Sequence, residues 1–294
     1  MERLREVLAF VNHKGGVGKT TTVQNLAAGL LRFGKGYFGV DAEGHQRCPR
    51  VLIIDLDPQA CVSFLFGWTA TLNAGKPNVY DALVQQSNLP IYRVRPGIYL
   101  APSVLDLEFI EPYLNQRPVP RKVLDKLLKK PLNEVSGTEL ADEGVTTVLE
   151  AFDYVLIDCP PAMSLLTYNA LTTATSVVLP VQLEILATKG IAEIINAIEE
   201  TREDLNPDLA IRGLLMVMSN DQTKVSKEFK AYLKKKFPDD MFIAYTRRDT
   251  KMGEAQRELL DIFAYAPHSR VGCDYEAFTK EILLSLKKTE NEQQ

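Results

Sequence analysis

The sequence predicts an α/β fold, doubly wound, in which helices cover both faces of a mostly parallel sheet. Short apolar runs of strand length recur along the 294 residues, and several lack the polar alternation of half-exposed strands. Segments with helical character lie between these runs, and such alternation of strands and helices is typical of this fold class. Hydrophobic residues form 46% and charged residues 24% of the chain, as in ordinary globular proteins.

The apolar runs predict eight strands, each bounded by turn residues or charged residues. In chain order they are Val7–Val11, Val51–Leu56, Ile98–Ala101, Tyr154–Ile157, Ser176–Val181, Leu214–Met218, Met241–Tyr245 and Ile262–Tyr265. The helical patterns predict helices at Thr20–Phe33, Leu124–Lys130, Thr188–Thr201, Val225–Phe237 and Tyr275–Leu286. Because no boundary divides the chain into two cores, we expect one domain over residues 1–288. Surface insertions are predicted near 34–50 and 115–143, and a polar tail over 289–294.

Charge and cysteine content narrow the function classes. The net charge is −4, so bulk basicity does not drive binding to nucleic acid or to anionic membranes. The segment Thr223–Lys251 is the exception, with seven lysines and two arginines against four acidic residues, a net charge of +5. The four cysteines form no CxxC pair, and no stretch is apolar enough to span a membrane, so a reducing cytoplasm is the expected location.

A glycine-rich loop joins the first predicted strand to the first predicted helix. It reads HKGGVGKTT from His13 to Thr21, the strand, loop and helix order of a phosphate-binding loop. Glycines let backbone N–H groups face phosphate oxygens, and the helix N-terminus adds a partial positive charge. The residues expected to hold the nucleotide are Gly15, Gly16, Val17, Gly18, Lys19, Thr20 and Thr21. Lys19 is expected at the β- and γ-phosphates, and Thr20 at Mg²⁺.

Acidic residues stand at the carboxyl ends of two other predicted strands. Asp55 and Asp57 end one strand in the sequence DLDPQ, and Asp158 ends another in DCPP. Ligands of open α/β sheets bind outside the carboxyl ends of the strands, so all three carboxylates are expected to face the loop. Carboxylate oxygens suit Mg²⁺, commonly through its bound waters.

At these residues the chain resembles the ParA/MinD family of deviant Walker-A ATPases, in the small form without an N-terminal helix-turn-helix domain. The matching segments are KGGVGKTT, DLDPQ, DCPP and PVQLE at Pro180–Glu184, in the order of the family. The resemblance implies ATP and Mg²⁺ as ligands, ADP as product, and a homodimer that forms with ATP. Lys14 would reach the phosphates of the neighbouring subunit, Asp57 would orient the attacking water, and Asp55 and Asp158 would hold the hydration shell of the metal.

The same resemblance implies a DNA-partition ATPase of plasmids or chromosomes. Its ATP-bound dimer would coat DNA without sequence preference, and a ParB-like adaptor would stimulate slow hydrolysis and release it, placing the protein in the nucleoid-associated cytoplasm. The candidate DNA contacts are basic residues of the positive segment: Lys224, Lys227, Lys230, Arg247, Arg248 and Lys251. A lysine face can also be simply solvated.

Two alternatives share this nucleotide site. One is ParA-like positioning of a cargo other than DNA, which the sequence does not separate from DNA partition. The other is a MinD-like membrane switch, for which the last predicted helix offers an apolar face containing Phe278, Ile282 and Leu283. Packing on the domain is the commoner use of such a face, and the polar tail is unlike an insertion sequence, so no stable membrane association is expected.

Overall fold

The computed structural model describes residues 6–35, 37–38, 44–132, 145–182, 187–219 and 241–292, with only the backbone described in 187–189 and 285–292. In this part of the chain, one eight-stranded sheet has the order β3-β4-β2-β5-β1-β6-β7-β8. The strands are β1 (Glu6–Phe10), β2 (Val51–Asp55), β3 (Tyr92–Arg95), β4 (Ile98–Ala101), β5 (Tyr154–Asp158), β6 (Ser176–Gln182), β7 (Ala210–Ser219) and β8 (Phe242–Arg247). Neighbouring strands are parallel except β3 and β4, which form an antiparallel pair.

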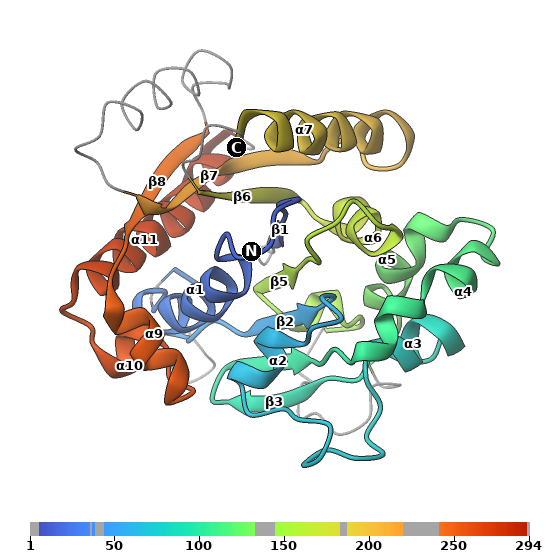
Figure 1. Cartoon of the computed structure of the whole chain (residues 1–294), viewed down its shortest axis with the longest axis horizontal. Coiled ribbons are helices and arrows are strands. Elements are labelled where there is room, and N and C mark those ends of the chain that lie inside the picture. The colour runs from blue at the N-terminus through green and yellow to red at the C-terminus, as the bar shows by residue number, and fades with distance from the viewer. Residues whose placement is uncertain are drawn as a thin grey trace.

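Helices cover both faces of this sheet, which confirms the predicted doubly wound α/β fold (Figure 1). The helices are α1 (Lys19–Phe33), α2 (Cys61–Leu65), α3 (Val79–Gln85), α4 (Glu111–Asn115), α5 (Val123–Leu128), α6 (Leu165–Thr173), α7 (Ala187–Asp204), α9 (Thr250–Arg257), α10 (Ile262–Tyr265) and α11 (Arg270–Glu292). Helices α1, α10 and α11 pack on one face, and α3, α5, α6 and α7 pack on the other.

The strands divide their side chains between two cores. In β1, Val7 and Ala9 belong to the core under α5, α6 and α7, whereas Leu8 and Phe10 belong to the core under α1 and α11. Successive side chains of a strand point to opposite faces, so a strand with apolar residues at every position is buried on both. This is why the uninterrupted apolar runs located the central strands correctly.

The prediction of a strand at Ile262–Tyr265 is wrong, because these residues form the short helix α10. Asp261 caps this helix, since its side chain accepts a hydrogen bond from the backbone N–H of Ala264 at 2.9 Å. Ile262 and Phe263 are buried against α1 and α11. A four-residue apolar run suits a buried helical turn as well as a strand, and the capping aspartate was the signal for the helix.

The remaining comparisons concern one predicted helix, the second predicted insertion and the predicted C-terminal tail. The predicted helix Val225–Phe237 lies outside the described residues. In the second predicted insertion, α5 buries Leu124, Leu127 and Leu128 in the main core. Helix α11 continues to Glu292, past the start of the predicted tail.

The register of the sheet brings the loop and the acidic strand ends together. Phe10, the last residue of β1, pairs with Asp158 of β5, and Asp158 pairs on its other side with Asp55 of β2. Strand β1 leads directly into the glycine-rich loop and α1. The carboxyl ends of these three central strands therefore meet at one place on the edge of the sheet.

Candidate nucleotide and magnesium site

The glycine-rich loop turns sharply at two of its glycines. Gly16 has a φ of 73° and Gly18 a φ of 76°, a left-handed backbone that glycine adopts without steric cost. At Gly18 a side chain would also meet β7, because a Cβ atom there would lie 3.4 Å from Cγ1 of Val217. The loop therefore keeps its backbone, and not side chains, toward the cleft in front of it.

Asn12 fixes this loop to the sheet. Its Nδ2 donates to the carbonyl oxygen of Pro180 in β6 at 2.6 Å, and its Oδ1 accepts from the backbone N–H of Lys14 at 2.8 Å. Both ends of the amide are thus used to hold the start of the loop. Asn12 is not among the predicted site residues, although a polar residue between a buried strand and a glycine-rich loop was an available signal.

Lys19 lies at the first turn of α1 with its side chain drawn under the loop. Only 6% of the residue is exposed. Its Nζ donates to the carbonyl oxygens of Asn12 at 3.3 Å and Lys14 at 3.4 Å. An ammonium group has three donors, so one remains for a ligand in the cleft that Lys19 lines. An anion is the partner that this arrangement favours.

Thr20 and Asp158 form the contact between the loop and β5. The hydroxyl of Thr20 donates to Oδ2 of Asp158 at 2.7 Å. The other carboxylate oxygen, Oδ1, is buried, and no described residue donates a hydrogen bond to it. A buried acceptor without a donor, beside a threonine hydroxyl, fits the water shell of a magnesium ion. The residues present therefore match the metal that the sequence predicts.

Asp55 is engaged differently from Asp158. Its Oδ2 accepts from the backbone N–H of Ser63 at 3.0 Å and from the Ser63 hydroxyl at 2.6 Å, and its Oδ1 accepts from the N–H of Asp57 at 3.1 Å. The carboxylate is fully buried. It holds the segment from β2 to α2 in place, and both of its oxygens accept hydrogen bonds within the protein.

Asp57 lies at the wall of the cleft. Its Oδ1 accepts from the backbone N–H of Gln59 at 3.0 Å, and its carbonyl oxygen accepts from the hydroxyl of Ser103 at 2.6 Å. Ser103 also donates its backbone N–H to the Ser63 hydroxyl at 3.0 Å. This chain of contacts orients a carboxylate that is 9% exposed. Asp57 is a predicted site residue, whereas Ser63 and Ser103, which position its segment, were not predicted.

Lys19, Thr20 and Asp57 border a cleft of about 1250 Å³. The loop forms one wall through Gly15, Lys19 and Thr20, and the segment that begins at Asp57 forms another. The third wall comes from the end of β8 and from α9, with Arg248 and Gln256 among its residues. The volume exceeds that of most small-molecule pockets. The loop, Asp57 and basic residues from distant parts of the sequence thus share one cavity.

Comparison with known proteins agrees with this geometry. The AAA-domain family model matches residues 5–211. The chromosome-partitioning ATPase Soj of Thermus thermophilus is 32% identical over 96% of both chains, and the chromosome partitioning protein ParA of Caulobacter vibrioides is 31% identical over 85% of this chain and 83% of its own. The chain belongs to the Soj/ParA family of ATPases.

A solved relative shows what this fold can hold. Cobyrinic acid a,c-diamide synthase from Mycobacterium smegmatis, crystallised with ADP and magnesium, is 27% identical and superposes with a TM-score of 0.71 over 97% of this chain and 96% of its own. The Soj/ParA-type chain is accordingly a P-loop ATPase by family and by fold. Within its described residues, no helix combines the length and apolar character needed to cross a bilayer.

The candidate DNA contacts of this Soj/ParA-type ATPase are only partly described. Lys224, Lys227 and Lys230 lie outside the described residues. The guanidinium of Arg247 pairs with Asp274, at 2.6 Å between Nη2 and Oδ1, and Lys251 pairs with Glu254 at 2.7 Å between Nζ and Oε2.

Arg248 is the third described basic residue of this set. It is exposed and lines the nucleotide cleft. The structure thus places Arg247 and Arg248 on the same cavity as the phosphate loop, a proximity that the sequence did not reveal.

Asp55 and Asp158, which are neighbours in the sheet, make the stability of the protein sensitive to pH. Burial and the nearby Asp158 carboxylate raise the pKa of Asp55 well above its usual value. Burial raises the pKa of Asp158 to about 7, although the Thr20 hydrogen bond and the Lys19 charge act in the opposite direction. A raised carboxyl pKa stabilises the fold at low pH, and this contribution is lost as pH rises through the folded-state value.

We therefore expect the nucleotide-free protein to lose thermal stability as the pH rises from about 4 to about 7, and the decline to level off above pH 7. The measurement is the unfolding midpoint at each pH for the unsubstituted chain and for Asp158→Asn. The amide cannot ionise, yet its oxygen can still accept from Thr20, so the substituted chain should show a smaller decline. Equal declines in the two proteins would mean that Asp158 does not titrate in this range.

Proposed function

We propose that the chain is a DNA-partition ATPase whose ATP-bound homodimer binds DNA without sequence preference. The main support for nucleotide binding is the hydrogen bond from Thr20 to Asp158 at 2.7 Å. It lies beside the phosphate loop, where Lys19 keeps one N–H donor for a phosphate oxygen. Membership of the Soj/ParA family supports the proposed homodimer and its binding to DNA. ATP and Mg²⁺ are the proposed ligands and ADP the product, as in the ADP- and magnesium-bound relative.

Each residue of the site has a proposed task. The loop N–H groups and Lys19 bind the phosphates, and Thr20 with Asp158 holds the magnesium ion and its waters. The ion would neutralise charge on the phosphate oxygens when bound. Asp55 keeps Asp57 in position, and Asp57 orients the attacking water. A carboxylate is a weak base, so hydrolysis is slow and sets the lifetime of the dimer.

Lys14 supplies the proposed link between hydrolysis and dimer formation. It is exposed at the start of the loop, where Asn12 fixes its backbone N–H. Reaching the phosphates of the partner subunit, it would stabilise charge that develops during phosphoryl transfer, as an arginine finger does. A ParB-like adaptor would accelerate this step, release the protein from DNA and link it to cargo.

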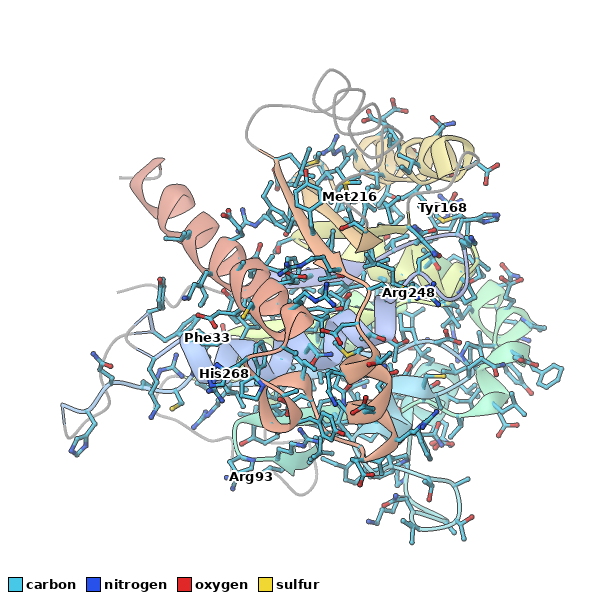
Figure 2. All side chains as sticks on the ribbon, turned by 60° about the vertical axis from the view of Figure 1, so that its left-hand side comes forward. Phe33, Arg93, Tyr168, Met216, Arg248 and His268 are labelled. Carbon is cyan, nitrogen blue, oxygen red and sulfur yellow. The ribbon has the colours of Figure 1, made fainter. Side chains whose placement is uncertain are left out.

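The DNA part of the proposal predicts a strong dependence on salt. Removing both Arg248 and Lys251 should weaken binding to DNA of every sequence and lower the slope of log affinity against log salt by about 0.9 for each lost phosphate contact. The measurement is DNA affinity and ATP turnover, with and without random-sequence DNA, at two salt concentrations. Arg93→Ala is the matched control, since Arg93 is exposed on β3, far from Arg248 in Figure 2.

If the double variant keeps the slope of log DNA affinity against log salt, then the DNA-binding surface does not include the residues at the end of β8 and the start of α9. A protein that hydrolyses ATP but binds no DNA at low salt would contradict DNA partition, and a cargo of another kind would then explain the ATPase.

A further inference from the structure

One polar contact joins the phosphate loop to a helix near the other end of the chain. Nε2 of Gln256, on α9, donates to the hydroxyl oxygen of Thr21, on α1, at 2.9 Å. The two residues are 235 positions apart, and both line the nucleotide cleft. Gln256 is half-buried. Gln256 lies outside all the sequence motifs of the nucleotide site.

The direction of this hydrogen bond determines where the Thr21 proton can go. An amide nitrogen only donates, whereas a hydroxyl can accept and donate at once. Because the Thr21 oxygen accepts from Gln256, its own proton remains to be donated, and among the described residues it has no acceptor. Thr21 follows Lys19 and Thr20, which take the outer phosphates and the metal. The next acceptor toward the sugar is the α-phosphate.

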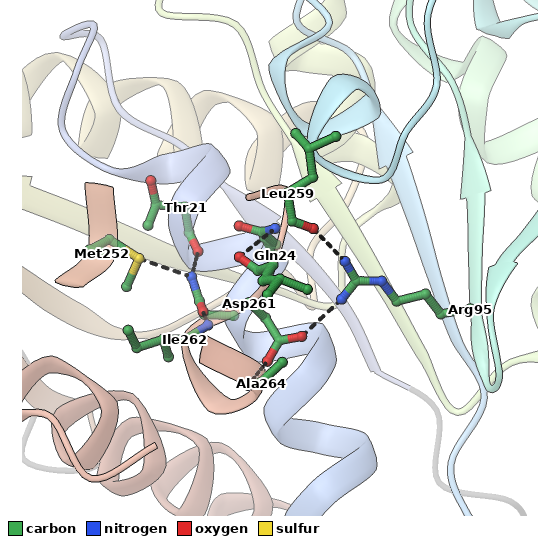
Figure 3. Close-up of polar contacts among 10 residues, drawn as sticks. Thr21, Gln24, Arg95, Met252, Leu259, Asp261, Ile262 and Ala264 are labelled. Atoms are coloured by element: carbon green, nitrogen blue, oxygen red, sulfur yellow. Dashed lines mark hydrogen bonds and ion pairs between the residues drawn. The ribbon is translucent and has the colours of Figure 1, made fainter. Parts of the chain in front are cut away.

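The backbone around both residues is held from the inside of the protein. Asn25 donates its Nδ2 to the carbonyl oxygen of Thr21 at 2.7 Å and accepts, through Oδ1, from the N–H of Ile262 at 2.7 Å (Figure 3). Asn25 is fully buried. One amide therefore fixes the first turn of α1 against the start of α10, and Gln256 connects the same turn of α1 to α9.

Arg95, on the edge strand β3, binds the segment between α9 and α10. Its Nη1 donates to Oδ2 of Asp261 at 2.8 Å and its Nη2 to the carbonyl oxygen of Leu259 at 2.8 Å (Figure 3). Leu259 has a φ of 54°, a conformation that is uncommon for residues other than glycine. The guanidinium thus holds the turn between α9 and α10, which directly follows Gln256.

We propose that Gln256 is a positioning residue of the nucleotide site, which orients the Thr21 hydroxyl so that it donates its proton to the α-phosphate of the bound nucleotide. This inference rests on the proposed nucleotide site, but not on hydrolysis, dimer formation or DNA binding. It assigns α9 a part in binding nucleotide and gives a physical reason for the long-range contact with α1.

ADP affinity tests the proposal, because ADP carries the α-phosphate but no γ-phosphate. Thr21→Val should weaken ADP binding about 10- to 100-fold, the usual loss for a hydrogen bond to a charged group. Gln256→Met, which keeps the length but not the donor, should weaken it about 3- to 10-fold, since the hydroxyl is no longer held in one orientation. Gln256→Asn, too short to reach Thr21, should behave like Gln256→Met.

The double variant separates positioning from a general structural effect. If Gln256 acts through the hydroxyl, adding Gln256→Met to Thr21→Val should cause no further loss of ADP affinity. Gln116→Met, at an exposed site outside the cleft, is the control. Unfolding midpoints of all variants identify any that fail to fold.

The outcomes distinguish this inference from the proposed function. Failure of the unsubstituted protein to bind ADP would overturn the nucleotide site itself. Normal ADP binding that is unchanged in folded Gln256→Met and Gln256→Asn would overturn only the role of Gln256. Additive losses in the double variant would also contradict it, because they would show that Gln256 acts independently of the hydroxyl.

Discussion

Replacing Lys19 with alanine is expected to lower ATP affinity by at least about 100-fold, corresponding to the loss of charge-assisted hydrogen bonds to phosphate. In the folded protein, two backbone carbonyls hold the Lys19 ammonium under the loop. No other described lysine lines the cleft. The measurement is an equilibrium titration with ATP and Mg²⁺, and the control is Lys126→Ala, an exposed lysine of α5 outside the cleft.

Loss of the Lys19 side chain should leave the fold intact, because water can reach the two carbonyl oxygens that it leaves. Unfolding midpoints of Lys19→Ala and Lys126→Ala should therefore be similar in the absence of nucleotide. Addition of ATP should stabilise only the Lys126→Ala protein. ATP affinity within threefold of the unsubstituted chain would show that the loop does not bind phosphate in the proposed way.

Substitution of Lys14 should have a different effect. Lys14→Gln is expected to change ATP affinity little and to reduce turnover about 10²- to 10³-fold, the usual effect of losing a charge that stabilises the transition state. The exposed side chain at the loop start is proposed to act on the partner subunit. Single-turnover hydrolysis at saturating ATP measures this effect, again with Lys126→Ala as the control.

A mixing experiment tests whether Lys14 acts across the dimer. Lys14→Gln and Asp57→Ala should each be nearly inactive alone. A mixed dimer has one site with Asp57 from one subunit and Lys14 from the other, so mixing the two proteins should restore part of the turnover. If mixtures stay inactive while mixed dimers form, Lys14 does not act in trans.

Local signals explain how the sequence predicts the candidate nucleotide site. A buried strand, a glycine-rich loop and a helix follow one another in the sequence, and the aspartates stand at strand ends that the fold class places side by side. The structure brings Thr20 and Asp158 within 2.7 Å as this reasoning requires. Asp55 pairs with Asp158 in the sheet register, and its hydrogen bonds to Ser63 were not predicted from the sequence.

The parts that escaped prediction depend on contacts between distant residues. Gln256 reaches Thr21 across 235 positions, and Arg95 reaches Asp261 across 166. No spacing rule connects such pairs. Strand β3 was missed because Arg93 and Arg95 alternate with Tyr92 and Val94 in a short run at the edge of the sheet. Such an edge strand lacks the continuous apolar pattern of the central strands.

The molecular mass in solution tests the central claim most directly. Sedimentation of the unsubstituted chain with ATP and Mg²⁺, with ADP and Mg²⁺, and without nucleotide should give a dimer only with ATP, and this dimer should be the form that co-sediments with DNA duplexes. Lys14→Gln should bind ATP but form less dimer. A chain that binds ATP with Mg²⁺ yet keeps the mass of a monomer, with or without DNA, would contradict the account.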